Sequence, residues 1–390
     1  MPKFNDLSHS LTAFEQDSTL VVVIDLAASS WSVGALVPGL DKQPLKKMAA
    51  DRYALLRQLE GWRAMAEAAG HSIKRICVAV ESGRDGFWLP RWLQARGIEA
   101  YVMHATSIPV TREHRRAKTD RLDVGILQRG FLGWLRGERK HCSMVKIPTR
   151  EEEDGKRPLR ERESLVGDRS RLINQMKSLL AQHGVRGFKV TTKKAAAQLK
   201  HVVTAEGLPL PPDISAQLER AMARFALIKA QIAQIETECV RRLKEAPEEG
   251  LHPMIRILAK VRGVGLMTAE LLVREILSRP MRDRRAIARY AGLTGSPDES
   301  GKRRREQGLA KAGNGRVRHT LIELAWRFLT HQKDSALAQW YFARTKDGRG
   351  PIRKVMIVAL ARKLLIALWE LATTGKLPEG VRLLSRPHVA

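Results

Sequence analysis

Apolar and polar positions in the first part of the chain alternate as a β-hairpin and then as helices and strands. Residues 19–26 (TLVVVIDL) form a continuous β-branched run, and residues 31–37 form a second after a short Ala-Ser-Ser turn, which predicts a hairpin. Apolar residues at helical spacing predict an amphipathic helix over 51–69. Further strands are expected at 75–80 and 98–103, and further helices at 86–96 and about 119–135. Residues 1–145 therefore read as an α/β domain with a mixed sheet.

The middle region, residues 146–250, has a helical period instead. A first helix is expected to end near Gln182, and a turn-rich segment follows over 184–213. The next apolar residues recur at seven-residue intervals, which defines an a/d heptad pattern. They are Leu218, Phe225, Ile232 and Cys239, interleaved with Ile214, Ala221, Ile228 and Ile235. Two interpretations are open: a helix packed inside its own chain, or a coiled-coil arm that joins protomers.

Residues 251–345 are predicted to be a compact, basic, all-α unit, and residues 346–390 a final helix from Pro351 to Thr373 with a tail. Two helices around Gly263 and Gly265 resemble a helix-hairpin-helix, whose glycines let backbone N–H groups approach a DNA phosphate. Lys260 and Arg262 adjoin this turn. An ordinary helical turn is the alternative.

The charge balance points to a polyanionic partner. The chain has 69 Lys and Arg against 41 Asp and Glu, a net charge of +28, and its 44% hydrophobic content is that of a globular protein. Nucleic acid is the first candidate partner and an anionic membrane surface the second. Arg362 and Lys363 interrupt the most apolar late stretch, the N-terminus has no visible signal peptide, and the three cysteines have no disulfide or zinc spacing. We expect a cytoplasmic protein.

Four carboxylates suggest a metal site. Asp25 and Glu81 come at the ends of two predicted strands, and Asp120 and Asp123 lie three apart on one helix face. Oxygen ligands suit Mg²⁺, or Mn²⁺ in its place, and paired ions stabilise the attacking and leaving oxygens of phosphoryl transfer. Taken singly, each acid could instead cap a turn or helix. Five cations beside the last pair are suited to phosphate backbone: Arg112, Arg115, Arg116, Lys118 and Arg121.

A serine in the C-terminal unit stands among cations. Ser300 precedes Gly301 and the run Lys302, Arg303, Arg304 and Arg305. Surrounding positive charge could activate its hydroxyl and stabilise an attacked phosphate, although serine is also a common turn residue. Ser296 is a competing hydroxyl four residues upstream. The other predicted nucleic-acid contacts in this region are Lys311, Asn314, Arg316 and Arg318.

Together these motifs resemble the DEDD transposases of bacterial insertion sequences, the IS110 family, which includes Piv-type invertases. The resemblance rests on Asp25 in VVVIDLAASSW, Glu81 in VAVESG, the pair in KTDRLDV, the glycine turn, and the block YAGL…ESGK…AKAGNGRVRH. It covers nearly the whole chain. It implies an N-terminal RuvC-like, ribonuclease-H-like domain, a middle coiled coil and a C-terminal transposase domain.

The resemblance also implies roles for these residues. The four carboxylates would bind the divalent metal, and Ser300 would be the nucleophile that forms a covalent phosphoserine link to a cleaved strand. The partners would be donor and target DNA and a structured noncoding bridge RNA that guides the protein. Family members act as tetramers in which one protomer's RuvC-like domain meets another's serine domain, so we expect a dimer or tetramer.

Two other functions remain open. A Holliday-junction resolvase-like endonuclease would use the acids and metal to activate water, and would leave no covalent protein–DNA link. A non-catalytic nucleic-acid-binding protein with a degenerate nuclease fold would show no metal-dependent cleavage, and the presence of all four acids argues against it.

Overall fold

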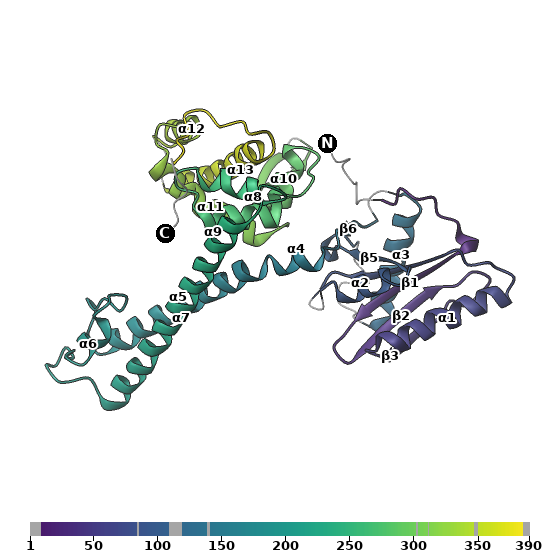
Figure 1. The fold of residues 1–390 in the computed structure, drawn as a ribbon, viewed down its shortest axis with the longest axis horizontal. Helices are drawn as coiled ribbons and strands as arrows, with labels where there is room; N and C mark the ends of the chain where they lie inside the picture. The colour runs from purple at the N-terminus through teal and green to yellow at the C-terminus, as the bar shows by residue number, and fades with distance from the viewer. Residues whose placement is uncertain are drawn as a thin grey trace. The chain divides into compact units, whose positions relative to one another are not determined.

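The structure is a computed structural model that describes residues 9–83, 86–108, 119–138, 141–301, 303–310, 312–346 and 350–384. The chain folds as two compact units, residues 1–150 and residues 151–390, and each is described by itself (Figure 1). The finer division into four regions stays a prediction. Of the predicted nucleic-acid contacts, Arg112, Arg115, Arg116, Lys118, Lys302 and Lys311 lie outside the described residues, and the side chains of Arg303 and Arg304 are not described.

The N-terminal unit is built on a six-stranded mixed sheet of order β3-β2-β1-β4-β5-β6. The predicted hairpin is confirmed, because β1 and β2 pair antiparallel, while β1–β4 and β4–β5 are parallel. The strands are β1 (Thr19–Leu26), β2 (Ser30–Leu36), β3 (Leu45–Ala49), β4 (Arg75–Glu81), β5 (Glu99–Met103) and β6 (Met144–Val145). Helices α1 (Arg52–Ala68), α2 (Trp88–Gln94) and α3 (Asp120–Leu135) complete the expected α/β domain.

Strand alternation gives this sheet two buried faces. Leu20, Val22 and Ile24 of β1 pack into the cluster that contains the buried residues of α1 and α2. Val21 and Val23 point the other way, into the cluster that contains α3. Both faces are covered, which explains the continuous apolar run of β1. The sequence pattern missed β3, an exposed edge strand with the sequence LKKMA, and β6, which has two residues.

A helical hairpin, which we call the arm, begins the C-terminal unit (Figure 1). It consists of α5 (Arg157–Gln182) and α7 (Pro212–Glu245), with the short α6 (Ala195–Leu199) in the connection. The helices run antiparallel, because Arg162 pairs with Glu236 at 2.6 Å at one end and Met176 packs beside Phe225 toward the other. The four residues of the seven-residue series in α7, Leu218 through Cys239, are buried within the single chain. The chain itself therefore supplies the packing partner of the heptad face, as the first interpretation expected.

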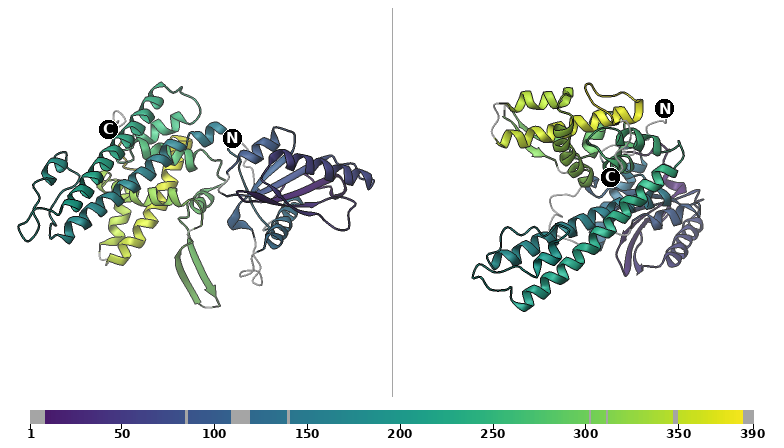
Figure 2. Two further views of the ribbon diagram at one scale, coloured as in Figure 1. Left: turned by 90° about the horizontal axis from the view of Figure 1, so that it is seen from below. Right: turned by 60° about the vertical axis from the view of Figure 1, so that its left-hand side comes forward.

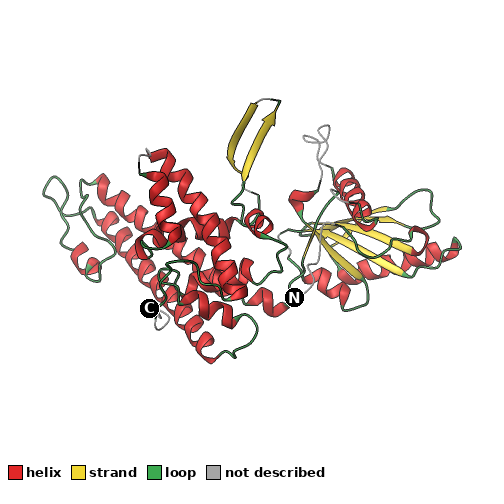
Figure 3. Cartoon of the chain, turned by 90° about the horizontal axis from the view of Figure 1, so that it is seen from above, coloured by secondary structure: helices red, strands yellow, loops and turns green. Residues whose placement is uncertain are grey.

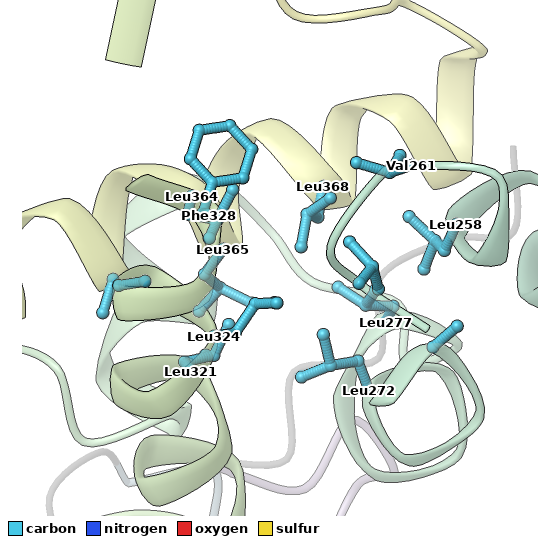
Figure 4. Packing of buried hydrophobic residues seen from close by; sticks show 14 of the residues in the cluster. Leu258, Val261, Leu272, Leu277, Leu321, Leu324, Phe328, Leu364, Leu365 and Leu368 are labelled. Atoms are coloured by element: carbon cyan, nitrogen blue, oxygen red, sulfur yellow. The ribbon is translucent and has the colours of Figure 1, made fainter. Parts of the chain in front are cut away.

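The remaining helices enclose the largest apolar core of the chain. Leu258 of α8, Leu272 of α9, Phe328 of α11 and Leu365 of α13 interdigitate in it (Figure 4). The elements are α8 (His252–Ala259), α9 (Leu266–Leu272), a π-helical turn (Val273–Leu277), α10 (Arg284–Tyr290), α11 (Gly315–His331), α12 (Ala336–Thr345) and α13 (Gly350–Thr374). The last helix matches the prediction for residues 351–373. A short helix α4 (Arg150–Asp154) links the two units.

The prediction that the C-terminal unit is all-α is wrong. Strands β7 (Gly295–Ser300) and β8 (Arg303–Leu309) form an antiparallel hairpin, the two-stranded yellow pair in Figure 3. Figure 2 shows it extending from the helices of its own unit. We call residues 295–309 the serine hairpin. Its strands are polar and charged, and no residue of theirs whose burial is described belongs to an apolar core, so they lack the apolar alternation that marks a half-buried strand.

All three cysteines are free and buried, as expected for reduced core thiols. Burial raises the pKa of Cys77, Cys142 and Cys239 to about 12, which leaves each thiol protonated at neutral pH.

Candidate functional site

Two predicted acids lie at the same end of neighbouring parallel strands. Asp25 follows Ile24 on β1 and Glu81 follows Val80 on β4, and Ile24 and Val80 are paired in register. Asp25 continues the side-chain alternation of Val21 and Val23, and Glu81 that of Cys77 and Ala79. Both carboxylates are therefore directed to the sheet face that carries α3. Asp25 is half-buried and Glu81 is exposed.

A glycine in β2 brings the first turn of α3 down onto this face. A Cβ at Gly34 would lie 2.4 Å from Cγ1 of Val124, so the helix packs against the sheet only because this side chain is absent. Asp123 precedes Val124, and Asp120 lies one turn earlier. The close packing thus brings the first turn of α3, which contains both acids, to the face where Asp25 and Glu81 emerge.

Asp120 is held by residues next to Asp25 in the sheet. Ser32 pairs with Asp25 across β1–β2, and Lys47 pairs with Ser32 across β2–β3. The Lys47 ammonium donates a 2.7 Å hydrogen bond to Oδ2 of Asp120. This bond, the charge of Lys47 and a hydrogen bond with Ser32 lower the pKa of Asp120, so the carboxylate stays ionised.

The start of α3 excludes one of the structural roles considered for Asp120, that of the helix N-cap. Thr119 is the N-cap, and its Oγ1 accepts a hydrogen bond from the N–H of Leu122 at 3.3 Å. Asp120 is therefore not the N-cap, and its carboxylate is directed to Lys47 and Ser32. We call Asp25, Glu81, Asp120 and Asp123 the carboxylate set.

The donor chemistry of the carboxylate set fits a hard divalent cation, because the set offers oxygen ligands from three elements on one sheet face. The four carboxylates do not surround a common point at which an ion could be bound. Within the described ranges, no three Asp, Glu, His or Cys side chains are grouped so as to hold a metal ion. Asp120 is instead engaged by Lys47. Of the five cations predicted beside the set, Arg121 is described and is exposed on the first turn of α3.

Ser300 is the last residue of β7, at the tip of the serine hairpin. It is exposed and pairs with Arg303 across a turn that contains Gly301, whose φ of +57° is in the left-handed region. Ser296 lies at the other end of the same strand, in the irregular stretch between Gly295 and Pro297. Four residues of extended chain separate the two hydroxyls, about 13 Å at the rise of a β-strand.

The base of the serine hairpin is fixed by close backbone packing. The N–H of Asn314 donates to the carbonyl of Tyr290 at 2.7 Å, and the N–H of Ala310 donates to Thr294 at 3.0 Å. Gly313 has φ of +92°, and a Cβ there would lie 2.4 Å from the Tyr290 carbonyl oxygen. Only glycine fits at this crossing.

A buried carboxylate ties the start of α11 to the arm. Glu275 is 4% exposed and accepts hydrogen bonds from Arg160 at 3.0 Å and from Nδ2 of Asn314 at 3.3 Å. Arg316 pairs with Glu163 of α5 and lies 3.8 Å from Glu275. Asn314 also caps α11, since its Oδ1 accepts from the N–H groups of Arg316 and Val317. Asn314 and Arg316 are thus engaged in structural contacts, which their charge and polarity alone did not reveal.

Arg318 differs from these neighbours. Its guanidinium lies against Gly292, where an added Cβ would be 2.4 Å from Nη1. This nitrogen is buried and has no hydrogen-bond partner among the described residues. Arg305, on β8, is exposed. Both residues remain predicted nucleic-acid contacts.

The predicted glycine turn opens on a groove. Gly263 and Gly265 have φ of +93° and +72°, and the turn joins α8 to α9. The groove has a volume of about 1720 Å³ and is lined by this turn, by Arg262, and by residues of α5 and α11. Lys260 and Arg262 are exposed beside it. A helix lies on each side of the turn as expected, while the helix-hairpin-helix and its contact with a phosphate stay predictions.

Several residues of these regions were not predicted. Lys47 and Ser32 are strand residues whose relation to Asp120 depends on sheet register, and Glu275 lies in the π-helical turn. The one sequence feature that could have indicated a buried carboxylate at Glu275 is its position as the single acid among the apolar residues of LLVREIL.

Comparison with known proteins defines the class of this chain. Residues 255–341 match the model of the IS116/IS110/IS902 transposase family, a segment that includes the glycine turn and the serine hairpin. The y4rJ protein of Sinorhizobium fredii, named as a transposase, is 39% identical over 386 residues, which are 96% of this chain and 98% of that protein. The chain belongs to this family and is a transposase.

Two more distant relatives are also named as transposases. The transposase for insertion sequence element IS1111A of Coxiella burnetii is 24% identical over 77% of this chain and 79% of its own length. The transposase for IS1328 of Yersinia enterocolitica is 26% identical over 55% of this chain and 62% of its own length. In the described part of the chain, no helix is long and apolar enough to cross a membrane.

Proposed function

We propose that this transposase cuts and rejoins DNA through a covalent bond between Ser300 and a DNA phosphate, with a divalent metal at the carboxylate set. The observation that carries the proposal is the position of Ser300. It is an exposed hydroxyl at the tip of a hairpin whose base is rigidly packed, and a glycine follows it. Such a tip can approach a phosphate without hindrance from its own neighbours.

The chemical step balances as a phosphoryl transfer. The Ser300 oxygen loses its proton and forms a bond to phosphorus, the phosphorus–oxygen bond to one deoxyribose breaks, and the released sugar oxygen takes a proton. The phosphodiester energy is retained in the serine link. Attack by the hydroxyl of a second strand then restores a phosphodiester and frees Ser300.

The carboxylate set would hold Mg²⁺ or Mn²⁺, which would supply charge stabilisation for the attacking and leaving oxygens. Asp25, Glu81 and Asp123 supply oxygen ligands on one sheet face. Asp120, which is ionised beside Lys47, would exchange this contact for the metal. All four carboxylates lie at strand ends or in the first turn of α3, and a metal ion would have to draw them closer together than they lie in the structure.

Positive charge near Ser300 supports the same role. Lys302 to Arg305 follow the serine directly, and Arg318 lies near the hairpin base with an unpaired buried nitrogen. Such groups neutralise the charge that develops on an attacked phosphate.

The family resemblance further implies the partners of the protein, which are a structured guide RNA and the donor and target DNA. It also implies a dimer or tetramer in which the RuvC-like domain of one protomer meets the serine domain of another.

A cleavage assay tests this function. The wild-type protein, incubated with its guide RNA, labelled DNA and Mg²⁺, is expected to give a protein–DNA adduct that survives denaturing electrophoresis. Ser300→Ala should remove the adduct and strand exchange, and Ser296→Ala should retain both.

The other outcomes have clear meanings. Metal-dependent cleavage without an adduct would favour attack by metal-activated water, as in a junction resolvase. Cleavage in neither the wild-type protein nor any variant would contradict catalysis and favour a binding protein.

A further inference from the structure

The end of the arm has an unusual charge composition. Residues 169–205 contain eight Lys and Arg and no Asp or Glu, although 41 of the 390 residues of the chain are acidic. The six cations nearest the end of the arm are all exposed, and no described carboxylate forms a salt bridge with them. They are Lys177, Arg186, Lys189, Lys193, Lys194 and Lys200. We call residues 177–205 the arm tip.

The arm tip is a folded surface with a core of its own. Val190, Ala195 and Leu199 are at most 5% exposed and pack against Met176 and Leu218 of the two long helices. Backbone hydrogen bonds also close the connection between α5 and α7. One of them joins its two ends: the N–H of Ala205 donates to the carbonyl of His183 at 3.0 Å. The lysines are therefore presented at fixed spacing, which a solvated linker would not provide.

The chemistry of the arm tip favours the phosphate backbone of a duplex over unpaired bases. Single strands are usually held by exposed aromatic rings on which bases stack. Phe188 is the segment's one Phe, Tyr or Trp and is half-buried, the two other rings are those of His183 and His201, and the exposed large apolar residue is Val203. Lysines that outnumber the rings available for stacking favour phosphates, which they bind without reading sequence.

The arm holds these charges away from the rest of its unit. Val240 of α7 packs on the large C-terminal core, whereas the arm tip joins α7 before Pro212. Some 28 residues of helix separate the two, about 42 Å at 1.5 Å per residue. At 3.4 Å per base pair this corresponds to about 12 base pairs of duplex.

We propose that the arm tip binds the phosphate backbone of double-stranded DNA flanking the recombination site, without sequence preference. The choice of DNA rests on the proposed function, since a transposase must hold duplex on both sides of the strand that it cuts. The contact would add affinity and orientation and would take no part in chemistry.

A charge-neutralising variant of the full-length protein tests this proposal. Lys189→Ala, Lys193→Ala and Lys194→Ala are combined, and the control combines Lys333→Ala, Lys346→Ala and Lys376→Ala, which are exposed elsewhere in the same unit and change the net charge equally. Binding to a 40-base-pair DNA of arbitrary sequence is measured by fluorescence anisotropy over a range of salt. The arm variant should bind at least about tenfold more weakly at ~0.1 M salt, and its log–log salt slope should fall by ~2.7, or 0.9 per lost contact.

Two results would overturn the proposal. Equal binding by the arm variant and the control would exclude the arm tip as a DNA contact. A loss confined to an RNA duplex of the same length would assign the surface to RNA. Formation of the Ser300 adduct is measured on the same protein preparations, so that the two proposals are tested separately. If the wild-type protein binds DNA through the arm tip but forms no adduct, only the proposed function is contradicted.

Discussion

The carboxylate set and the serine hairpin present their functional side chains by opposite means. Asp25 and Glu81 are extensions of buried strands, and the neighbouring rows of Val21, Val23 and Ala79 fix which way they point. Ser300 lies on a hairpin of two polar strands with no described residue in an apolar core, and its position depends on a few backbone contacts at the hairpin base. In the sheet, the packing of the core fixes the positions of Asp25 and Glu81. In the serine hairpin, the backbone contacts at the base fix the position of Ser300.

This difference bears on how each region tolerates change. Apolar packing over a whole face resists displacement, and only substitutions that push α3 from the sheet should move the carboxylates. The hairpin tip is far from stabilising contacts, so small changes at Gly313 or Gly292 should move Ser300 with modest effect on the core.

The largest expected effect is at the carboxylate set. Asp25→Asn keeps the shape of the side chain and removes its charge, so the fold should stay intact while metal-dependent strand exchange falls by about a thousandfold, the equivalent of ~4 kcal/mol. A strand-exchange assay in Mg²⁺ measures this, with DNA binding and circular dichroism as controls. Strand exchange at the wild-type rate would remove Asp25 from the metal site.

Gly34→Ala tests whether packing positions the acids of α3. The new Cβ would meet Val124 at 2.4 Å, and overpacking of this kind costs about 1–3 kcal/mol. We expect a stability loss in that range by urea denaturation and a larger loss of strand exchange, since Asp120 and Asp123 move with the helix. Gly61→Ala, on α1 with open space around it, is the matched control and should be neutral or slightly stabilising. Full strand exchange with lowered stability would contradict the packing argument.

Gly313→Ala makes the corresponding test of the hairpin. Its positive φ and the Tyr290 carbonyl both oppose a side chain, with a conformational cost of at least about 1–2 kcal/mol. The structure predicts that adduct formation falls more than thermal stability, because the hairpin carries Ser300 but little core. Equal adduct yield would show that the hairpin base does not control the position of the serine.

The smallest effect concerns Lys47 and Asp120. The pKa of Asp120 is lowered in the folded protein, so this ion pair contributes stability above the ordinary carboxyl pKa and loses it as pH falls through the lowered value. Both groups are largely exposed, so the contribution is small. Lys47→Met should raise the pKa of Asp120 toward its ordinary value, as measured by NMR titration of the carboxyl carbon. An unchanged pKa would mean that Lys47 is not its main partner.

Periodicity predicted most of the fold where apolar residues face a core. The β1–β2 hairpin, α1, α3 and α13 were predicted within a few residues for this reason. The same pattern marked α7 correctly as a heptad helix but left its partner open, because α5 in the same chain satisfies the spacing as well as a second protomer would. Pattern alone cannot distinguish these two partners.

The rest of the candidate site escaped prediction for physical reasons. The serine hairpin has Gly295, Pro297 and Gly308 among charged residues and no apolar alternation, so nothing in its sequence indicated strands. Asn314 and Arg316 look like nucleic-acid contacts until their distances to Glu275 and Glu163 are known. Lys47 could be related to Asp120 only through the register of an edge strand.

The most direct test of the central claim is to map the covalent link by peptide mass spectrometry. Adducts formed with DNA, guide RNA and Mg²⁺ are digested, and the peptide that carries the nucleotide is sequenced. We predict the modification on Ser300 at the tip of the hairpin. A link on Ser296, at its base, would contradict the claim and move the nucleophile by four residues.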